Sequence, residues 1–228
     1  MDVTIIVPAY NEEQNVALFY KTMKKMMDTQ KGINFEVVIV DDGSDDNTHN
    51  KLREINDSRL HILRLERHRG KCYALFKGIE GSRGDIIANL DIDLQNEPMD
   101  LPQMIGMLGE GCDMVCGWRV KRKDGFAKLV STRVGNLFNN MLTGAGLHDN
   151  TCPVKVYKKA CVSNLRYFRN FHRFMPIMAK KQGFILKEFQ VRHYPRRFGK
   201  SKYGIHNRIF GNLATILTIK TNHKRLLK

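Results

Sequence analysis

Short apolar runs alternate with amphipathic stretches along the first half of the chain. Five of these runs have the length and composition of buried strands, and they span residues 3–8, 35–40, 60–65, 86–91 and 114–118. Apolar residues recur at helical spacing between the first two runs, and again between the third and the fourth. Strands that alternate with helices through short connections predict an α/β fold, with a mainly parallel sheet and helices on both of its faces.

Polar or turn-forming residues directly follow three of these runs. The three segments are Pro8-Ala9-Tyr10, Asp41-Asp42 and Asp91-Ile92-Asp93. In an open α/β sheet, ligands bind at the carboxyl ends of the strands. We therefore expect the three segments to lie together and to line one binding site.

The fourth apolar run leads into a possible metal site. Asp91, Asp93 and Gln95 alternate along the chain, and alternate side chains of extended backbone leave on the same side. Three such oxygens can be offered to one hard cation, which predicts a site for Mg²⁺ or Mn²⁺. Taken alone, an Asp-X-Asp segment is more typical of a solvated strand end followed by a turn, so the hypothesis depends on the other motifs.

Three N-terminal motifs together resemble glycosyltransferase family two, whose members have the Rossmann-like GT-A fold. These motifs are Val7–Glu12, Val40–Ser44 and Asp91–Gln95. Three later segments are similar to the polyprenyl-phosphate branch of that family, which includes the dolichol-phosphate mannose synthases. They are Gly117–Arg119, His172–Pro176 and Arg196–Gly204. The resemblance covers nearly the whole chain.

The resemblance implies an inverting transfer of a sugar from a nucleotide-diphosphate sugar to a polyprenyl or dolichyl phosphate. Donors of the GDP-mannose and UDP-glucose types are both compatible with these motifs. The donor-binding residues that the resemblance implies are Pro8, Tyr10, Glu12, Val40, Asp42, Asp91, Arg196 and Lys202. It also implies that Asp93 and Gln95 hold the Mg²⁺ or Mn²⁺ ion, and that Asp91 and Asp93 are the catalytic residues.

On the acceptor side, the resemblance implies that Arg119 and Arg133 bind the lipid phosphate. A guanidinium suits this role because its planar fork of donors matches phosphate oxygens and keeps its charge. Asp149 resembles the aspartate that precedes the acceptor-side helix of the family, although it also fits a helix or turn cap. The oxygen of a polyprenyl phosphate is already ionised near neutral pH, so this acceptor requires no general base.

The net charge of +15 is distributed unevenly along the chain. Residues 1–118 hold 13 Lys or Arg against 20 Asp or Glu, a net charge of −7, whereas residues 119–228 hold 25 against 3, a net charge of +22. The basic half predicts an anionic partner such as a membrane surface.

We divide the chain into a catalytic domain, residues 1–203, and an amphipathic membrane-interface segment, residues 204–228. Within the catalytic domain, residues 1–118 form the nucleotide-sugar half and residues 119–203 the acceptor half. The sequence contains no secretory signal and no apolar run long enough to span a bilayer. We therefore expect a cytoplasmic protein that is peripheral on the cytoplasmic face of a membrane. A partner protein or missing C-terminal transmembrane helices would supply an anchor.

Three other functions remain open from the sequence. A family-two enzyme that transfers sugar to a saccharide hydroxyl would need a base, for which Asp149 is the candidate. A basic nucleic-acid-binding module would explain the charge of residues 119–228 but would leave Asp91, Asp93 and Gln95 without a role. A hydrolase could use His172 or His193 as a base, but neither histidine stands in a known hydrolase motif. A processive polysaccharide synthase is disfavoured because Trp118 is not part of a Gln-X-X-Arg-Trp motif.

The five cysteines have no spacing typical of a disulfide framework or a zinc site. They are Cys72, Cys112, Cys116, Cys152 and Cys161. We expect them to be reduced packing residues, as is usual in a protein of the cytoplasm.

Overall fold

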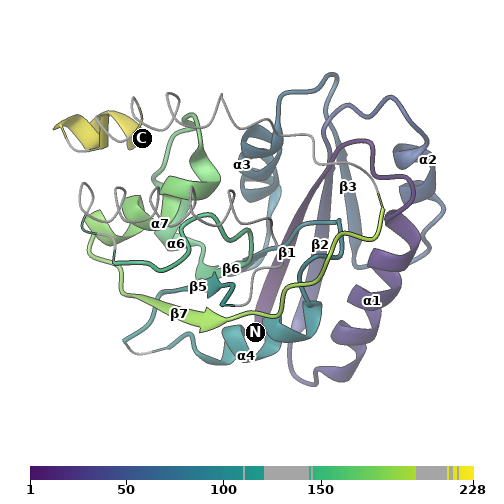
Figure 1. Cartoon of the computed structure of the whole chain (residues 1–228), viewed down its shortest axis with the longest axis horizontal. Helices are drawn as coiled ribbons and strands as arrows, with labels where there is room; N and C mark the ends of the chain where they lie inside the picture. The colour runs from purple at the N-terminus through teal and green to yellow at the C-terminus, as the bar shows by residue number, and fades with distance from the viewer. Residues whose placement is uncertain (110, 121–143, 145, 199–214, 216–217, 220) are drawn as a thin grey trace.

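A seven-stranded sheet forms the centre of the computed structural model, which describes residues 1–109, 111–120, 144, 146–198, 215, 218–219 and 221–228 (Figure 1). The strands are β1 (Asp2–Ala9), β2 (Asn34–Asp41), β3 (Leu60–Arg64), β4 (Ile86–Asn89), β5 (Met114–Trp118), β6 (Lys155–Lys158) and β7 (Leu186–Gln190). Their order in the sheet is β3-β2-β1-β4-β6-β5-β7. Strand β6 runs antiparallel to β4 and β5, and the other neighbouring pairs are parallel. The predicted mainly parallel sheet is confirmed.

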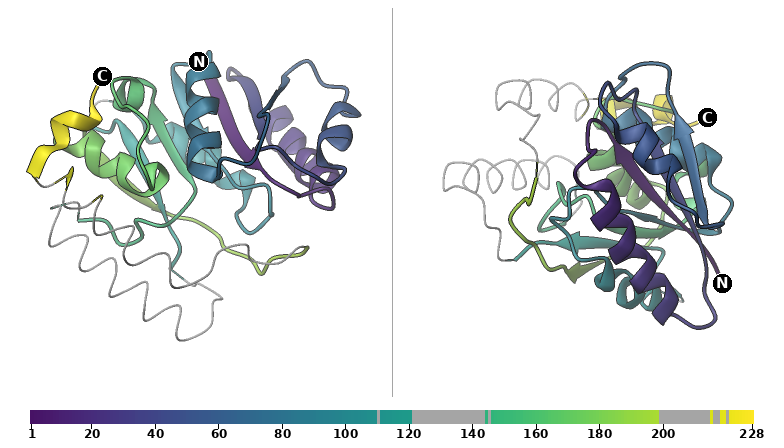
Figure 2. Two further views of the ribbon diagram at one scale, coloured as in Figure 1. Left: turned by 90° about the horizontal axis from the view of Figure 1, so that it is seen from above. Right: turned by 90° about the vertical axis from the view of Figure 1, so that its right-hand side faces the viewer.

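Helices cover both faces of the sheet, as the alternating pattern predicts (Figures 1 and 2). Their bounds are α1 (Val16–Thr29), α2 (Thr48–Arg53), α3 (Lys71–Gly81), α4 (Leu101–Gly106), α6 (Ala160–Ser163) and α7 (Phe171–Lys181), with the 3₁₀ turns η1 (Pro98–Asp100) and η2 (His223–Leu226). Side chains alternate across β1, so Ile5 packs in the core with α1 and α4, whereas Ile6 packs in the core with α3 and α7. The two cores hold the strand ends in fixed positions relative to one another.

The fourth predicted strand is shorter in the structure than in the sequence-based prediction. Strand β4 ends at Asn89, and residues 92–94 form a turn in which Leu94 has a φ of 58°. The expectation that Asp91, Asp93 and Gln95 lie on extended backbone is therefore wrong. The positive φ rotates the chain after Asp93, so the third side chain leaves in a different direction from the first two.

Two predicted segments lie largely outside the described residues. One is the helical stretch 128–142 that contains Arg133, and the other is most of residues 204–228. Lys202 also lies outside the described residues. Within the C-terminal segment, the described Ile219 is fully buried in the core that contains α3 and α7. Leu227 forms a β-bridge with Leu165. The end of the chain is thus attached to the body of the protein.

None of the helices in the described parts of the chain is long and apolar enough to cross a bilayer.

Candidate active site

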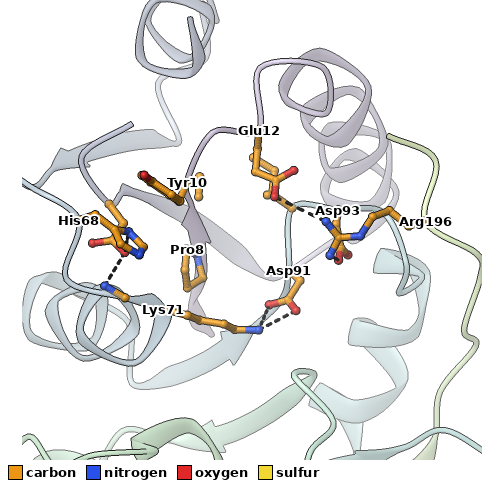
Figure 3. Close-up of a pocket in the computed structure, with 12 residues that line it drawn as sticks. Pro8, Tyr10, Glu12, His68, Lys71, Asp91, Asp93 and Arg196 are labelled. Atoms are coloured by element: carbon orange, nitrogen blue, oxygen red, sulfur yellow. Dashed lines mark hydrogen bonds and ion pairs between the residues drawn. The ribbon is translucent and has the colours of Figure 1, made fainter. Parts of the chain in front are cut away.

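A pocket of about 300 Å³ opens at the carboxyl ends of β1, β2 and β4 (Figure 3). The residues that line it are Pro8, Ala9, Tyr10, Glu12, Asp42, His68, Gly70, Lys71, Asp91, Ile92, Asp93 and Arg196. The three polar strand ends predicted to meet do lie together. Of the residues implied for donor or metal binding, the pocket collects Pro8, Tyr10, Glu12, Asp42, Asp91, Asp93 and Arg196.

The end of β1 contributes one wall of the pocket. The Tyr10 ring stacks on His68, with ring centroids 3.9 Å apart and an interplanar angle of 26°. Asn11 has a φ of 50°, and its backbone N–H donates to Ser44 Oγ at 3.0 Å. The turn after β1 is therefore held against the turn after β2, which keeps Tyr10 and Glu12 facing the pocket (Figure 3).

Asp42 is held by the loop that precedes α3. Its Oδ1 accepts the backbone N–H of Arg69 at 2.8 Å, and its Oδ2 accepts that of Gly70 at 2.8 Å. His68 Nδ1 lies 2.9 Å from the same Oδ2. The residue is 1% exposed, so these contacts compensate the carboxylate for its loss of hydration. They fix its orientation at the floor of the pocket.

Gly43 allows this close approach of two loops. Its φ is +68°, and a Cβ at this position would lie 2.5 Å from the backbone carbonyl carbon of Arg67. A residue with a side chain would meet both the conformational cost of positive φ and a clash with backbone. Glycine therefore lets the Asp42 turn and the Arg67–Lys71 loop touch.

Each of the two acidic side chains after β4 is paired with a cation. Lys71 Nζ lies 2.5 Å and 2.6 Å from the two carboxylate oxygens of Asp91. Arg196 Nη2 donates to Asp93 Oδ2 at 2.7 Å, and Arg196 Nη1 lies 3.9 Å from Glu12 Oε1. Figure 3 shows the two pairs side by side across the pocket. The cations come from α3 and from the segment after β7, and they balance charge at the carboxylates.

The electrostatics of this pair of carboxylates suit a divalent cation. Burial raises the pKa of Asp93 to about 6, and the nearby charge of Asp91 contributes to the rise, whereas Arg196 opposes it. A bound cation would favour the ionised form of both carboxylates. No group of three His, Cys, Asp or Glu side chains within the described residues could hold a metal by itself. Two carboxylates, with the remaining ligands from a diphosphate and water, match the usual binding of Mg²⁺.

Gln95 and Val40 do not line the pocket. The side-chain amide of Gln95 donates to the Tyr194 carbonyl at 3.4 Å, because the turn at Leu94 directs it toward the segment after β7. Val40 is fully buried in the core beneath α3, where its Cγ2 would lie 3.2 Å from a Cβ on Gly78. Val40 thus packs in the core, and its implied contact with the donor stays a prediction. The implied donor residue Lys202 lies outside the described residues.

Arg119 lies after β5 in a buried network with Asp149. Its Nε donates to Asp149 Oδ2 at 2.7 Å, and its Nη2 donates to Asp149 Oδ1 at 3.1 Å and to Thr151 Oγ1 at 2.9 Å. The side chains of Arg119 and Asp149 are 9% and 4% exposed. Asp149 therefore orients the guanidinium. The second implied phosphate ligand, Arg133, lies outside the described residues.

Sequence reasoning missed three residues of the pocket, His68, Gly70 and Lys71. The sequence feature that could have identified them is the basic run Arg67-His68-Arg69-Gly70-Lys71, which stands immediately before a predicted helix. A basic run at this place puts cations at the edge of the sheet where the strands end. In the helical pattern, Lys71 stands out only as the first residue of a helix. Its partner Asp91 lies 20 residues away, and contacts of this kind depend on the packing of α3 against β1.

His172, one of the two sequence-based candidates for a hydrolase base, contacts a cysteine thiol. His172 Nδ1 lies 2.9 Å from Cys72 Sγ, and burial raises the pKa of this thiol. A thiol with a raised pKa is a poor nucleophile. All five cysteines are free, and all except Cys72 are buried.

Comparison with known proteins gives consistent results for sequence and for fold. The model of the protein family described as glycosyl transferase family 2 matches residues 4–166. The dodecaprenyl-phosphate galacturonate synthase of Rhizobium johnstonii is 33% identical over 226 residues, which cover 96% of this chain and 66% of that protein. The undecaprenyl-phosphate 4-deoxy-4-formamido-L-arabinose transferase of Pseudomonas aeruginosa is 33% identical over 205 residues, which cover 88% of this chain and 60% of that protein. The chain thus spans less than two thirds of the length of these relatives.

Among solved structures, glucosyl-3-phosphoglycerate synthase from Mycobacterium tuberculosis has the same fold. Its complex with Mn²⁺, uridine-diphosphate and phosphoglyceric acid superposes with a TM-score of 0.71 at 15% identity, over 97% of this chain and 78% of that chain.

Proposed function

Since the chain belongs to glycosyl transferase family 2, we propose that it transfers a sugar from a nucleotide-diphosphate sugar to a polyprenyl phosphate. The names of two relatives that are 33% identical, a dodecaprenyl-phosphate and an undecaprenyl-phosphate sugar transferase, support the acceptor class. The pocket at the ends of β1, β2 and β4 supports the donor class. Its paired carboxylates and cations suit a diphosphate with a divalent ion.

The observation that carries this proposal is the buried pair of Arg119 and Asp149. Transfer to a saccharide hydroxyl requires a group that removes the hydroxyl proton, and Asp149 is the sequence-based candidate for it. Both of its oxygens accept hydrogen bonds from Arg119, and Oδ1 also accepts from Thr151 Oγ1. A carboxylate held by these charge-assisted bonds is a weak base. The geometry therefore favours an acceptor that is already ionised, such as a lipid phosphate.

The leaving group determines the roles of the pocket cations. Negative charge grows on the nucleotide diphosphate as the glycosidic bond breaks, and preorganised positive charge stabilises that state more than the ground state. A divalent cation held by Asp91 and Asp93 would supply Lewis-acid stabilisation of the diphosphate. Lys71 and Arg196 already lie at these two carboxylates and can donate to diphosphate oxygens. Attack by the acceptor phosphate from the opposite face of the sugar inverts the anomeric carbon.

We also propose that the donor carries uracil rather than guanine. Asp42 already accepts two backbone N–H groups and lies within hydrogen-bonding distance of His68, so one lone pair on Oδ1 remains for a ligand. Uracil offers one ring N–H for such a contact. Guanine offers adjacent N–H and NH₂ donors, which together call for two free carboxylate oxygens. The Tyr10 ring beside Asp42 provides an aromatic surface for either base.

Release of the nucleotide diphosphate tests the proposal directly. The protein is incubated with Mn²⁺, a short-chain polyprenyl phosphate and, in separate reactions, UDP-linked and GDP-linked sugars. We expect UDP to be released only when both the lipid phosphate and Mn²⁺ are present, together with a glycosylated lipid of the expected mass. Release of GDP would contradict the assignment of the base. Transfer to a free saccharide, with none to the lipid phosphate, would contradict the acceptor class.

A further inference from the structure

Lys155 is a fully buried lysine that has no part in the site described above. It begins β6 and is 1% exposed, which makes it one of the largest fully buried side chains of the protein. Its Nζ donates a hydrogen bond to the Cys152 carbonyl. No Asp or Glu in the described part of the chain forms an ion pair with it. A buried ammonium without a carboxylate partner is costly and calls for another source of negative charge.

The sheet register places Lys155 between the strand that leads to Asp91 and the strand that leads to Arg119. Its neighbours are Asn89 on β4, two residues before Asp91, and Cys116 on β5, three residues before Arg119. Paired residues of adjacent strands direct their side chains to the same face, which here is the face covered by α3 and α7. The N-terminus of α3 carries Lys71 on this face.

The surroundings of the ammonium provide little compensation for its charge. Burial lowers the pKa of Lys155, while the thiols of Cys116 and Cys152 and the carboxylate of Asp149 oppose this change. The thiols are themselves neutral because burial raises the pKa of each of them. Asp149 is engaged by Arg119. In its protonated form, Lys155 places positive potential between the strand that leads to Asp91 and the strand that leads to Arg119.

We propose that Lys155 is a positioning residue whose buried charge attracts the phosphate oxygens of the substrates toward the junction between Asp91 and Arg119. This inference rests on the proposed function, because it requires anionic substrates at both sides. The charge acts through a low-dielectric interior, where its attraction is screened less than that of a surface lysine. The bond to the Cys152 carbonyl keeps the ammonium in place, at the turn that carries Asp149.

Three substitutions separate a role of the charge from a role of the hydrogen bond. Lys155→Gln removes the charge and keeps an N–H donor, Lys155→Arg keeps both, and Lys155→Met removes both at similar volume. Lys158→Gln is the matched control, because Lys158 lies on the same strand, is 41% exposed and pairs with Asp113 at 2.8 Å. Circular dichroism verifies that each variant is folded.

The readout is the rise in Tm that each ligand produces, so it does not depend on turnover. One arm adds a short-chain polyprenyl phosphate, a second adds UDP with Mg²⁺, and binding constants are taken from the same titrations. We expect Lys155→Gln and Lys155→Met to weaken binding in at least one arm by about tenfold, and Lys155→Arg and Lys158→Gln to retain it. The arm that changes identifies whether the acceptor phosphate or the donor diphosphate is attracted.

Two results overturn the inference in different ways. If the wild-type protein gains Tm from both ligands and Lys155→Gln gains as much, the charge has no role and the proposed function still holds. If the wild-type protein gains Tm from neither ligand and transfers no sugar, the proposed function fails and the inference fails with it. Should Lys155→Gln not fold, the comparison of Lys155→Met with Lys155→Arg decides by the same criterion.

Discussion

At the scale of single residues, the free pocket balances each carboxylate with a cation. Asp91 pairs with Lys71, and Asp93 pairs with Arg196. Asp91 and Asp93 would hold a divalent ion together with a bound diphosphate, and Lys71 and Arg196 would then donate to the phosphate oxygens. The same four side chains would therefore provide charge balance with and without the donor.

Asp93→Asn should abolish nearly all sugar transfer while the fold persists. The substitution removes one charged oxygen from the proposed cation site, which weakens binding of the ion and its stabilisation of the leaving group by several kcal/mol. The Tm should remain within a few degrees of the wild-type value. The raised pKa of the buried Asp93 carboxyl shows that its ionised form is disfavoured in the folded state, so loss of the charge costs little stability. Turnover, Mn²⁺ titration and thermal melting measure the three effects.

The control for this variant is Asp85→Asn, since Asp85 is an exposed carboxylate on the same chain segment before β4. It should leave turnover and Mn²⁺ affinity unchanged. Full activity of the wild-type protein with all divalent metal chelated would eliminate the role proposed for Asp93.

At the scale of elements, the turn after β2 and the loop before α3 form one structural unit around Asp42. Gly43→Ala should destabilise this unit, because Cβ would lie 2.5 Å from Arg67 backbone and the φ of +68° is unfavourable for alanine. We expect a loss of about 2 to 4 kcal/mol in the free energy of unfolding, from strain and displaced backbone together. Affinity for UDP should fall as well, because the loop orients both Asp42 and His68. Urea unfolding and calorimetry provide the two measurements.

Gly32→Ala is the matched control for the clash. Gly32 has a similar φ of +79°, but a Cβ there meets nothing within 4 Å. Gly32→Ala should lower the free energy of unfolding by only about 1 kcal/mol, because it adds the backbone strain of a positive φ without a clash. It should not affect UDP binding. Equal losses of stability in the two variants would show that the contact with Arg67 is unimportant.

The elements that could be predicted from sequence are those whose pattern is local. Strands β1 and β2 are continuous apolar runs buried on both faces, so their presence and their polar ends follow from composition. Strand β6 holds the buried Lys155 and a short Lys-Val-Tyr-Lys sequence, and β7 alternates weakly, so neither has a recognisable strand pattern. Both are strands because they pair with β5, which is a long-range contact.

The same distinction explains the prediction of the site. Pro8, Asp42 and Asp93 lie at or just after strand ends, so they could be assigned to the pocket from position alone. Gln95 lies away from the pocket because the positive φ of Leu94 interrupts the alternation of side chains along the segment. No residue type in that segment requires a positive φ. Lys71 enters the pocket through the packing of α3, which sequence spacing does not specify.

At the scale of the whole molecule, the charge asymmetry has a direct consequence for location. Residues 119–228 carry a net charge of +22, and no Asp or Glu follows Glu188. A positive surface is attracted to anionic lipid, and this attraction weakens as salt screens it. We propose that the protein binds the surface of an anionic membrane, where a polyprenyl phosphate head group is accessible.

The exposed basic residues at the end of the chain should contribute to that binding. Lys224, Arg225 and Lys228 are exposed, whereas the neighbouring Ile219 is buried in the core, so truncation would remove core contacts along with charge. Neutralising the three residues to Gln is the cleaner change. Each basic residue near an anionic surface is worth about 1 kcal/mol, so the triple variant should bind vesicles that contain anionic lipid roughly a hundredfold more weakly at low salt.

Vesicle flotation at several salt concentrations measures this effect, and a second triple variant serves as its control. Lys21, Lys24 and Lys25 are also exposed, but they lie on α1 in the half of the chain with a net charge of −7. Replacing them with Gln removes the same total charge and should weaken binding much less. If the two triple variants lose affinity equally, net charge alone drives the association. If neither loses affinity, or if wild-type binding is insensitive to salt, the C-terminal residues do not contact the membrane through their charge.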